Sequence, residues 1–393
     1  MLLKNEGVKE SGVRSQEAAP LLPLDLSKTK RILVVGENAI KMMTVGGGSS
    51  SLKVQKEILP LDGIRARFKD VTVDYVRGYV GDTVQSYNGV TVGRSLYETR
   101  SQAELTAEAV EKAREADVVI FIGGLNKSDH QDCEGHDRLS YDLPYAQNEV
   151  IEAILKVNPR LVYVNISGNG STLPGLPKVP AVLQAWFIGS EAGEAIASVL
   201  AGDVNPSGKL PFTWYASLSQ CGAHALNTYP GTWRDDHKII DEVYAEDVFV
   251  GYRWTDRLKK EKPLFPFGHG LSYTTFKLGK VTADKKNIAA DEQITFTVDV
   301  TNTGQQAGAE TVQLYISDKQ SSVNRPVKEL KGFRKVFLRP GETQSVSITV
   351  GRDALSFYDE TSSSWKAEPG DFEALIGCSA ADIRSRCSFT LLP

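Results

Sequence analysis

Residues 117–144 have the sequence DVVIFIGGLNKSDHQDCEGHDRLSYDLP and decide the fold. Residues 117–122 predict a buried strand, because a continuous β-branched and aromatic run is typical of a parallel sheet covered on both faces. Two glycines end this strand, and eight titratable residues then fall within the ten positions 129–138. Loops at the carboxyl ends of such strands carry the sites of α/β folds, so we expect the chemistry of the chain in this loop.

Strands and helices alternate around the loop from residue 31 to residue 215. Further strands are predicted at 31–36, 71–76, 161–166 and 180–186. Helices are predicted at 101–115, 144–158 and 189–202. The first begins with Ser101 and Glu104 as a capping box, and the second has Pro144 in its first turn. This alternation implies right-handed βαβ crossovers and a mostly parallel sheet flanked by helices, which is an α/β sandwich.

The pattern changes twice after residue 215. Residues 216–274 contain several prolines and many aromatic residues, which favours an irregular connecting strap. From residue 275 onward, segments of apolar and polar alternation are separated by turn signals, as in an all-β immunoglobulin-like sandwich. We therefore predict four parts: a leader or linker over 1–30, the α/β sandwich domain over 31–215, the strap over 216–274 and the β-sandwich over 275–393.

The composition excludes some classes of protein. The chain has 393 residues, of which 41% are hydrophobic and 24% charged, so it can build two or three cores. Its formal net charge of −4 gives no reason to predict nucleic acid or an anionic membrane as a partner. No signal peptide or membrane span is predicted. The four cysteines lack metal-ligand spacing and favour free thiols, although Cys378 and Cys387 could pair across a hairpin in an oxidising compartment.

Glu134 is the main catalytic candidate in the loop. It lies in a glycine-punctuated segment, where its carboxyl group can act as an acid, a base or a nucleophile. The alternative interpretation is a solvated surface charge. We predict that the neighbouring Asp137 and Arg138 form a local ion pair that fixes the loop to the following helix.

Two other features could bind a ligand. His130 and His136 invite a metal site with Asp132, but two histidines on a loop without a third fixed ligand give weak support, so we predict no metal. Residues 46–51, GGGSSS, suggest a phosphate cradle, yet neither GxGxxG nor GxxxxGK[ST] is present, which disfavours a nucleotide. A flexible turn is the alternative, and we favour a loop whose bare backbone lets a ligand approach closely. No cofactor is predicted.

Several spaced motifs resemble one known family. Residues 134–138, EGHDR, followed by DLP at 142–144, resemble the EGxDR...LxLP signature of the C-terminal α/β domain of glycoside hydrolase family 3, the β-glucosidase and β-xylosidase family. The segments AWF at 185–187, NPSGKLP at 205–211 and PFGHGLSY at 266–273 agree with the family in their order. The β-sandwich resembles the fibronectin type III-like domain of the same family. The resemblance covers nearly the whole chain.

The resemblance implies a retaining β-glycosidase that hydrolyses terminal β-D-glycosyl residues with two carboxyl groups about 5–5.5 Å apart. Glu134 matches the general acid/base of the family, and Asp132 is the rival candidate. The family's nucleophile is an aspartate on an N-terminal (β/α)8 barrel of ~250 residues, whereas thirty residues precede the first predicted strand here. The chain therefore resembles a C-terminal portion that is inactive without the barrel.

The resemblance also implies roles for other residues and partners. The residues that would border the substrate are Gly47, Gly48, Ser49 and Ser50. Those that would orient the loop are His136, Asp137 and Arg138. The expected partners are a β-glycoside or oligosaccharide substrate and a barrel domain or chain that supplies the nucleophile, with no nucleic acid and no membrane. The alternative function is a non-catalytic carbohydrate-binding or scaffold module.

Overall fold

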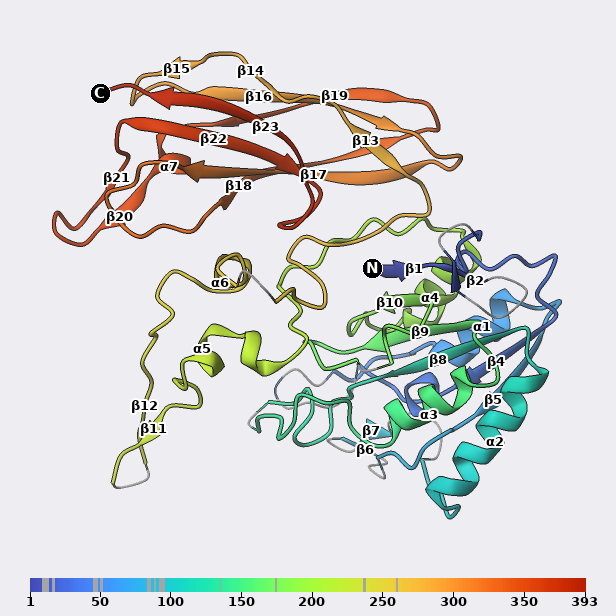
Figure 1. The fold of residues 1–393 in the computed structure, drawn as a ribbon. Coiled ribbons are helices and arrows are strands. Elements are labelled where there is room, and N and C mark those ends of the chain that lie inside the picture. The colour runs from blue at the N-terminus through green and yellow to red at the C-terminus, as the bar shows by residue number, and fades with distance from the viewer. Residues whose placement is uncertain are drawn as a thin grey trace. The chain divides into compact units, whose positions relative to one another are not determined.

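The computed structural model describes residues 1–8, 18–44, 49, 52–82, 96–134, 136–173, 175–235, 238–258 and 261–393, together with the backbone of 14–15, 86–87 and 90–91. The chain forms two compact units, Met1–Pro206 and Ser207–Pro393. Figure 1 shows a sheet flanked by helices in the first unit and two packed sheets in the second. The predicted fold class, an α/β sandwich followed by a β-sandwich, is confirmed, and the strap 216–274 falls within the second unit.

The first unit is built on a six-stranded sheet with the order β1-β10-β9-β8-β4-β5. Its strands are β1 (Leu2–Asn5), β4 (Arg31–Val35), β5 (Thr72–Val76), β8 (Val118–Gly124), β9 (Leu161–Ile166) and β10 (Ala181–Gln184). All neighbours are parallel except β1, which pairs with β10 in the antiparallel direction. Every residue of β8 and β9 is buried, as their continuous apolar runs predict.

The beginning of the chain differs from the prediction. We predicted a leader over 1–30, but Leu2–Asn5 form the edge strand β1 of the sheet. Leu2 is 0% and Leu3 is 2% exposed, so these residues belong to the core. Asn5 adds an anchor, because its side-chain amide exchanges hydrogen bonds of 2.7 and 3.0 Å with the backbone of Leu22. A short hairpin of β2 (Gly7–Val8) and β3 (Arg14–Ser15) follows.

The helices of the first unit pack in two pairs on opposite faces of the sheet (Figure 1). The pairs are α1 (Pro60–Arg67) with α4 (Ala192–Ala201), and α2 (Gln102–Glu115) with α3 (Gln147–Leu155). The predicted capping box is present, since Ser101 Oγ accepts from the Glu104 N–H and the Glu104 carboxylate accepts from the Ser101 N–H. Helix α3 begins at Gln147 instead of Pro144, because Tyr145 has a left-handed φ of 61° that cannot continue a helix.

The remaining short elements of the first unit are η1 (Glu37–Ala39), β6 (Ser86–Tyr87) and β7 (Val90–Thr91). Those of the strap in the second unit are η2 (Leu218–Gln220), α5 (Gly222–Ala225), β11 (Thr232–Trp233), β12 (Ile240–Asp241) and α6 (Tyr252–Thr255).

The β-sandwich of the second unit consists of two sheets with a shared apolar core. One sheet has the order β13-β16-β14, with β19 also paired to β16, and the other has the order β15-β23-β22-β17-β18. The strands are β13 (Phe276–Leu278), β14 (Thr282–Ala283), β15 (Asn287–Ile288), β16 (Ile294–Asn302), β17 (Gly308–Asp318), β18 (Glu329–Leu338), β19 (Thr343–Val350), β22 (Gly370–Gly377) and β23 (Ile383–Leu391). Helix α7 (Arg352–Leu355) and the hairpin of β20 (Phe357–Asp359) and β21 (Ser364–Lys366) lie between β19 and β22 in the sequence. The inward residues of both sheets form one cluster that includes Phe296, Val312 and Phe372.

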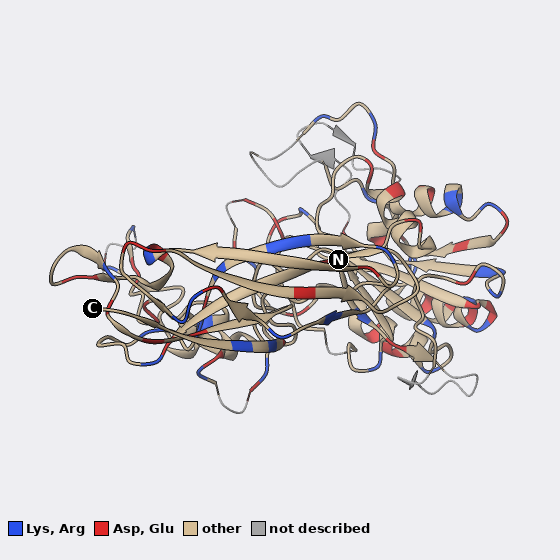
Figure 2. Ribbon diagram, turned by 90° about the horizontal axis from the view of Figure 1, so that it is seen from above, with Lys and Arg blue, Asp and Glu red and all other residues tan. Residues whose placement is uncertain are grey.

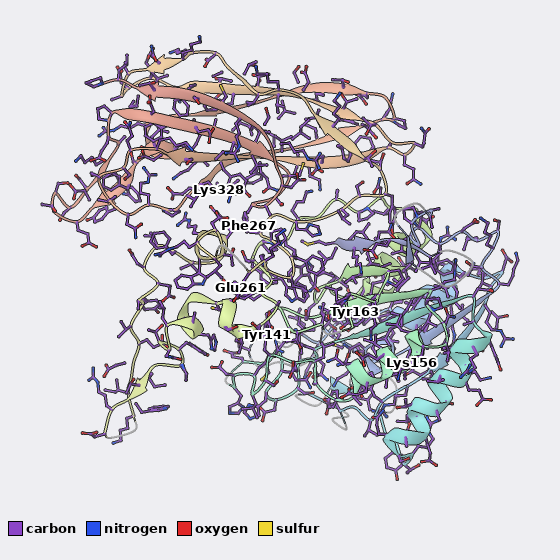
Figure 3. The ribbon with its side chains drawn as sticks, in the orientation of Figure 1. Tyr141, Lys156, Tyr163, Glu261, Phe267 and Lys328 are labelled. Atoms are coloured by element: carbon purple, nitrogen blue, oxygen red, sulfur yellow. The ribbon has the colours of Figure 1, made fainter. Side chains whose placement is uncertain are left out.

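The strap packs on the β-sandwich through α6 and the segment after it. The Tyr252 hydroxyl accepts a 2.9 Å hydrogen bond from the Leu330 N–H, and its ring centroid lies 5.8 Å from that of Tyr315 in β17. The same ring lies 5.0 Å from that of Phe267 in the strap. Asp256 forms an ion pair with Lys328 of the sandwich. Figure 3 labels Phe267 and Lys328 along this contact. The strap is therefore a packed part of the second unit.

Charged residues of both signs are interspersed along the ribbons of both units (Figure 2). None of the helices in the described part of the chain is long and apolar enough to cross a membrane.

Candidate active site

The candidate loop leaves the sheet at the carboxyl end of β8, where Gln147 of α3 ties both of its ends together. The buried Gln147 amide accepts from the Gly124 N–H and donates to the Gly124 carbonyl, both at 2.8 Å, and it also donates to the Pro144 carbonyl at 2.9 Å. A side chain at Gly123 would overlap the Gln147 amide oxygen, so this glycine is needed for the close approach. The loop thus begins and ends at one fixed point.

A second loop, 167–170, follows β9 and is held by a buried polar network. Asn165 Nδ2 donates to Gln184 Oε1 at 2.6 Å and to Ser167 Oγ at 2.8 Å. Gln184 Nε2 donates to the Ser167 carbonyl at 3.0 Å, and the Tyr163 hydroxyl donates to Asn165 Oδ1 at 2.8 Å. Because all of these groups are buried and paired, the second loop has one favoured position.

Asp132 joins the candidate loop to this second loop. Its Oδ2 accepts from the Gly168 N–H and its Oδ1 accepts from Asn169 Nδ2, both at 2.6 Å. Burial raises the pKa of Asp132, while the Gly168 hydrogen bond and the nearby Arg138 charge oppose that shift. With both oxygens engaged, Asp132 is placed to hold the loop.

Arg138 makes a parallel attachment. Its guanidinium donates to Asn169 Oδ1 and to the Gly170 carbonyl, both at 2.7 Å, and to the Asp142 carbonyl at 3.2 Å. Burial lowers the pKa of this half-buried side chain. The predicted ion pair with Asp137 is not formed between these two described residues, because the guanidinium reaches across to loop 167–170 instead of its chain neighbour.

Glu134 has the opposite environment. Its side chain is exposed, and its Oε2 accepts a 2.6 Å hydrogen bond from the Ser49 N–H. The hydrogen bonds from Ser49 lower the pKa of Glu134, so its carboxylate form is favoured. Ser49 and Glu134 are predicted site residues from separate parts of the sequence, and the fold brings them into contact. The other glycine-loop residues that we selected, Gly47, Gly48 and Ser50, lie outside the described residues.

His136 belongs to a different group of side chains. Its Nδ1 contacts Asp129 Oδ1, and its ring stacks on that of His130 with centroids 5.1 Å apart. The hydrogen bond with His136 lowers the pKa of Asp129. The acidic partner of the two histidines is therefore Asp129, whereas the sequence suggested Asp132, which faces loop 167–170.

Family models match most of the chain. The model of the glycosyl hydrolase family 3 C-terminal domain matches residues 1–273, and that of a fibronectin type III-like domain matches residues 310–380. The chain belongs to glycosyl hydrolase family 3. The resemblance of the EGHDR motif and the surrounding segments to this family is thereby confirmed.

Several similar proteins are named β-glucosidases. The chain is 48% identical over 397 residues to β-glucosidase BoGH3A of Bacteroides ovatus, a match that covers 99% of this chain and 50% of that protein. It is 38% identical over 381 residues to thermostable β-glucosidase B of Acetivibrio thermocellus, covering 97% and 47% of the two chains. The crystal structure of the Kluyveromyces marxianus β-glucosidase in complex with glucose matches with a TM-score of 0.82 and 28% identity, covering 100% of this chain and 60% of that chain. The chain spans about half the length of the curated relatives it matches.

A buried cluster of charges, which is not among the residues predicted from the sequence, supports the start of the family 3 loop. Lys41 Nζ pairs with Asp82 and lies 3.8 Å from Glu37 Oε1, while Arg77 pairs with Glu37 Oε2 at 2.8 Å. Ser128 of the loop contacts both Asp82 and, at 3.3 Å, Lys41. Burial raises the pKa of Glu37. A lysine at position 41 within an apolar stretch is the one local signal that could have revealed the cluster.

Other supporting residues of the site were also missed. They are Gln147, Asn165, Gly168, Asn169 and Gln184. Asn165 and Gln184 lie in otherwise apolar strands, and that break in the pattern is a usable signal for a buried polar network.

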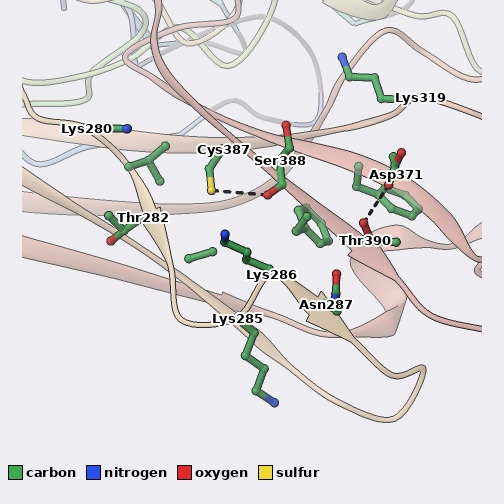
Figure 4. A pocket seen from close by; sticks show the side chains of 14 residues that line it. Lys280, Thr282, Lys285, Lys286, Asn287, Lys319, Asp371, Cys387, Ser388 and Thr390 are labelled. Carbon is green, nitrogen blue, oxygen red and sulfur yellow. Dashed lines mark hydrogen bonds between the residues drawn. The ribbon is translucent and has the colours of Figure 1, made fainter.

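The second unit contains grooves of a different kind. The largest groove described there has a volume of about 700 Å³ and is lined by lysines, with Asp371 and Cys387 on its walls (Figure 4). Two of its lysines are already paired, Lys285 with Glu292 at 2.7 Å and Lys319 with Glu373 at 2.9 Å. Asp371 is the one acidic residue among the described residues that line this groove, so the groove does not bring carboxyl groups together as the loop after β8 does.

Proposed function

We propose that this chain is the C-terminal part of a retaining β-glycosidase, acts on terminal β-D-glucosyl-like residues, and supplies Glu134 as the general acid/base. The contrast between the two candidate carboxylates, Asp132 and Glu134, supports the proposal. Asp132 has both oxygens occupied by Gly168 and Asn169, whereas Glu134 is exposed and held by the N–H of Ser49. Of these two, Glu134 is the carboxylate that can meet a substrate, and Asp132 holds the loop that presents it.

The proposed reaction needs a second carboxylate, expected on a (β/α)8 barrel outside this chain. That carboxylate attacks the anomeric carbon while the Glu134 carboxyl group gives its proton to the leaving glycosidic oxygen. Water then hydrolyses the glycosyl ester, and Glu134 takes the proton from that water. His136, Asp137 and Arg138 are proposed to orient the loop, and residues 47–50 to border the substrate.

The protonation state of Glu134 explains why the barrel is needed for more than its nucleophile. The Ser49 hydrogen bonds lower the pKa of Glu134, which suits a base and opposes an acid. Burial under a second domain and the negative charge of a neighbouring nucleophile both raise the pKa of a carboxyl group. The isolated chain therefore carries an ionised Glu134, and the completed site restores its acid function.

The experiment adds the proposed barrel to the chain. The half of BoGH3A that this chain does not match is fused ahead of Met1, and hydrolysis of aryl β-glucosides is measured. The chain alone is expected to give negligible turnover and the fusion to be active. In the fusion, Glu134→Gln should lower kcat/KM by about 10²–10⁴-fold for a poor leaving group, with a smaller loss for an activated one. Azide should restore turnover of the activated substrate and yield a β-glycosyl azide.

Asp132→Asn in the same fusion is the matched control. It loosens the loop and lowers activity for all leaving groups, and azide should not rescue it. Rescue of Asp132→Asn but not of Glu134→Gln would move the acid/base role to Asp132. Full activity of the chain alone that survives Glu134→Ala would refute the proposal.

A second candidate, a carbohydrate-binding module without catalysis, is favoured by two aromatic residues of β18. Phe333 and Phe337 are each 65% exposed and lie on one side of the strand, about 13 Å apart at the rise of a β-strand. Exposed rings of this kind can stack on sugar faces. Calorimetric titration of the chain with cello-oligosaccharides, repeated with Phe333→Ala, tests it: binding that the substitution abolishes supports the module, and absence of binding rules it out.

A further inference from the structure

The loop that carries Glu134 also gathers four metal-ligating side chains. Asp129, His130 and His136 each offer one ligand atom, and these atoms all lie within 4.8 Å of one another on the surface. Cys133 lies beside them, with its Sγ 4.0 Å from Asp129 Oδ1 and 3.6 Å from the His136 carbonyl. A carboxylate and two imidazoles thus meet within eight positions of the chain, and the Cys133 thiol lies beside the carboxylate but outside this 4.8 Å group.

The orientation of His130 leaves a nitrogen available for a metal. Its Nδ1 lies 3.0 Å from the Asp137 carbonyl. A carbonyl oxygen only accepts hydrogen bonds, so Nδ1 must carry the hydrogen, and Nε2 of the neutral ring then has a free lone pair. This backbone support of the second ring nitrogen is the arrangement that metal-ligating histidines adopt in general. The free Nε2 lies 3.9 Å from Asp129 Oδ2.

The distances suit one small tetrahedral ion. Ligands at the usual zinc distances of 2.0–2.3 Å lie about 3.3–3.8 Å from one another in a tetrahedron. The 3.9 Å separation of His130 Nε2 and Asp129 Oδ2 needs only a small adjustment. Cys133 Sγ lies 4.0 Å from the other carboxylate oxygen, Asp129 Oδ1, and must rotate toward the ion to become a ligand. His136 and Asp129 are closer than two ligands of one ion, so they must separate slightly when the ion replaces the proton between them.

We propose that Asp129, His130, Cys133 and His136 form a binding site for a divalent transition-metal ion of the zinc class. Nitrogen and sulfur ligands favour such an ion over Mg²⁺ or Ca²⁺, which prefer oxygen ligands. Two histidines on a loop without a third fixed ligand give weak support for a metal, and in the structure Asp129 is that third ligand. Cys133 and His136 flank Glu134 in the chain, so an ion bound here lies beside the proposed acid/base.

The test measures binding directly and does not depend on catalysis. The full chain is stripped with a chelator and titrated with Zn²⁺ in competition with a chromophoric chelator. One ion per chain is expected. Asp129→Asn, His130→Ala and His136→Ala should each weaken binding by about 10–100-fold or more. The matched controls are His224→Ala and Cys387→Ser, which alter a histidine and a thiol elsewhere in the chain and should leave the affinity unchanged.

Cobalt(II) gives a second measurement. A tetrahedral site with a thiolate should show intense visible bands and a near-ultraviolet sulfur-to-cobalt charge-transfer band that Cys133→Ser removes. A spectrum without that band, unchanged in Cys133→Ser, would remove Cys133 from the site. The proposal is overturned if Zn²⁺ does not bind, or if the His130→Ala, His136→Ala double variant binds it as tightly as the unchanged chain. Because Asp129, His130 and His136 are exposed and Cys133 is only partly buried, the variants should fold, and circular dichroism checks that they do.

Discussion

Replacing Asp82 by asparagine is expected to destabilise the first unit strongly. The Lys41 side chain is 0% exposed and the Asp82 side chain 8% exposed, so asparagine would leave a buried ammonium group without its closest counter-charge. Glu37 lies 3.8 Å from Lys41 Nζ but already pairs with Arg77 at 2.8 Å. Removing one partner of a buried pair costs about 3–5 kcal/mol of unfolding free energy, and we expect that loss here.

The double variant Lys41→Met, Asp82→Asn separates a charge imbalance from a general loss of packing. It removes one charge of each sign and leaves Glu37 paired with Arg77. Because a buried pair replaced as a whole is often nearly neutral in stability, the double variant should lose at least about 2 kcal/mol less than the sum of the two single variants.

Hydrogen exchange of peptides from β4 and β8 measures these changes within the first unit, independently of the second. A loss of 3–5 kcal/mol corresponds to roughly 10²–10⁴-fold faster exchange in Asp82→Asn. An increase below tenfold would show that the pair is not a closed buried network. Additive losses in the double variant would show that the charges act independently, and either result refutes the reasoning.

Three further predictions concern packing, the loop anchor and an exposed ion pair. Gly63→Ala should destabilise the first unit by more than 1 kcal/mol in denaturant unfolding, because a methyl group at Gly63 would overlap the backbone of Gly193 where α1 crosses α4; an unchanged midpoint would contradict this. Gln147→Leu should cost about 2–4 kcal/mol, since it leaves the Gly124 N–H and carbonyl buried without partners, and exchange of the β8 amides should reveal it. Asp203→Asn should lower the free energy of unfolding by at most about 1 kcal/mol at neutral pH, because the ion pair of Asp203 with Arg67 is exposed. The hydrogen bond lowers the pKa of Asp203 from 3.8, so the stabilisation exists above that value and disappears as the pH falls through the folded-state pKa; stability curves of the two proteins should therefore converge in acid.

The features predicted correctly from the sequence are those that short segments determine. The capping box of Ser101 and Glu104 spans three positions, and its hydrogen bonds form within them. The apolar runs of β8 and β9 are buried on both faces wherever a parallel sheet places them. The EGHDR motif indicated the family because its residues are contiguous in the chain. Helix α3 is one exception, since the left-handed Tyr145 delays its start and no local signal shows this. Strand β1 and helix α1 are two others, because neither is among the predicted elements.

The sequence by itself determined most of the long strands and helices, the two kinds of unit, the family and the loop that carries Glu134. Only the tertiary structure decided the partners of polar side chains that meet residues far away in the sequence. Asp132 meets Gly168, 36 positions away, and Lys41 and Ser128 meet across 87 positions. The acidic residue beside His130 and His136 is Asp129, although the sequence suggested Asp132 for that place. The physical reason is that hydrogen bonds and ion pairs depend on distances in space, which periodicity and composition do not encode, whereas the hydrophobic pattern of a strand or helix is local and can be recognised from sequence alone.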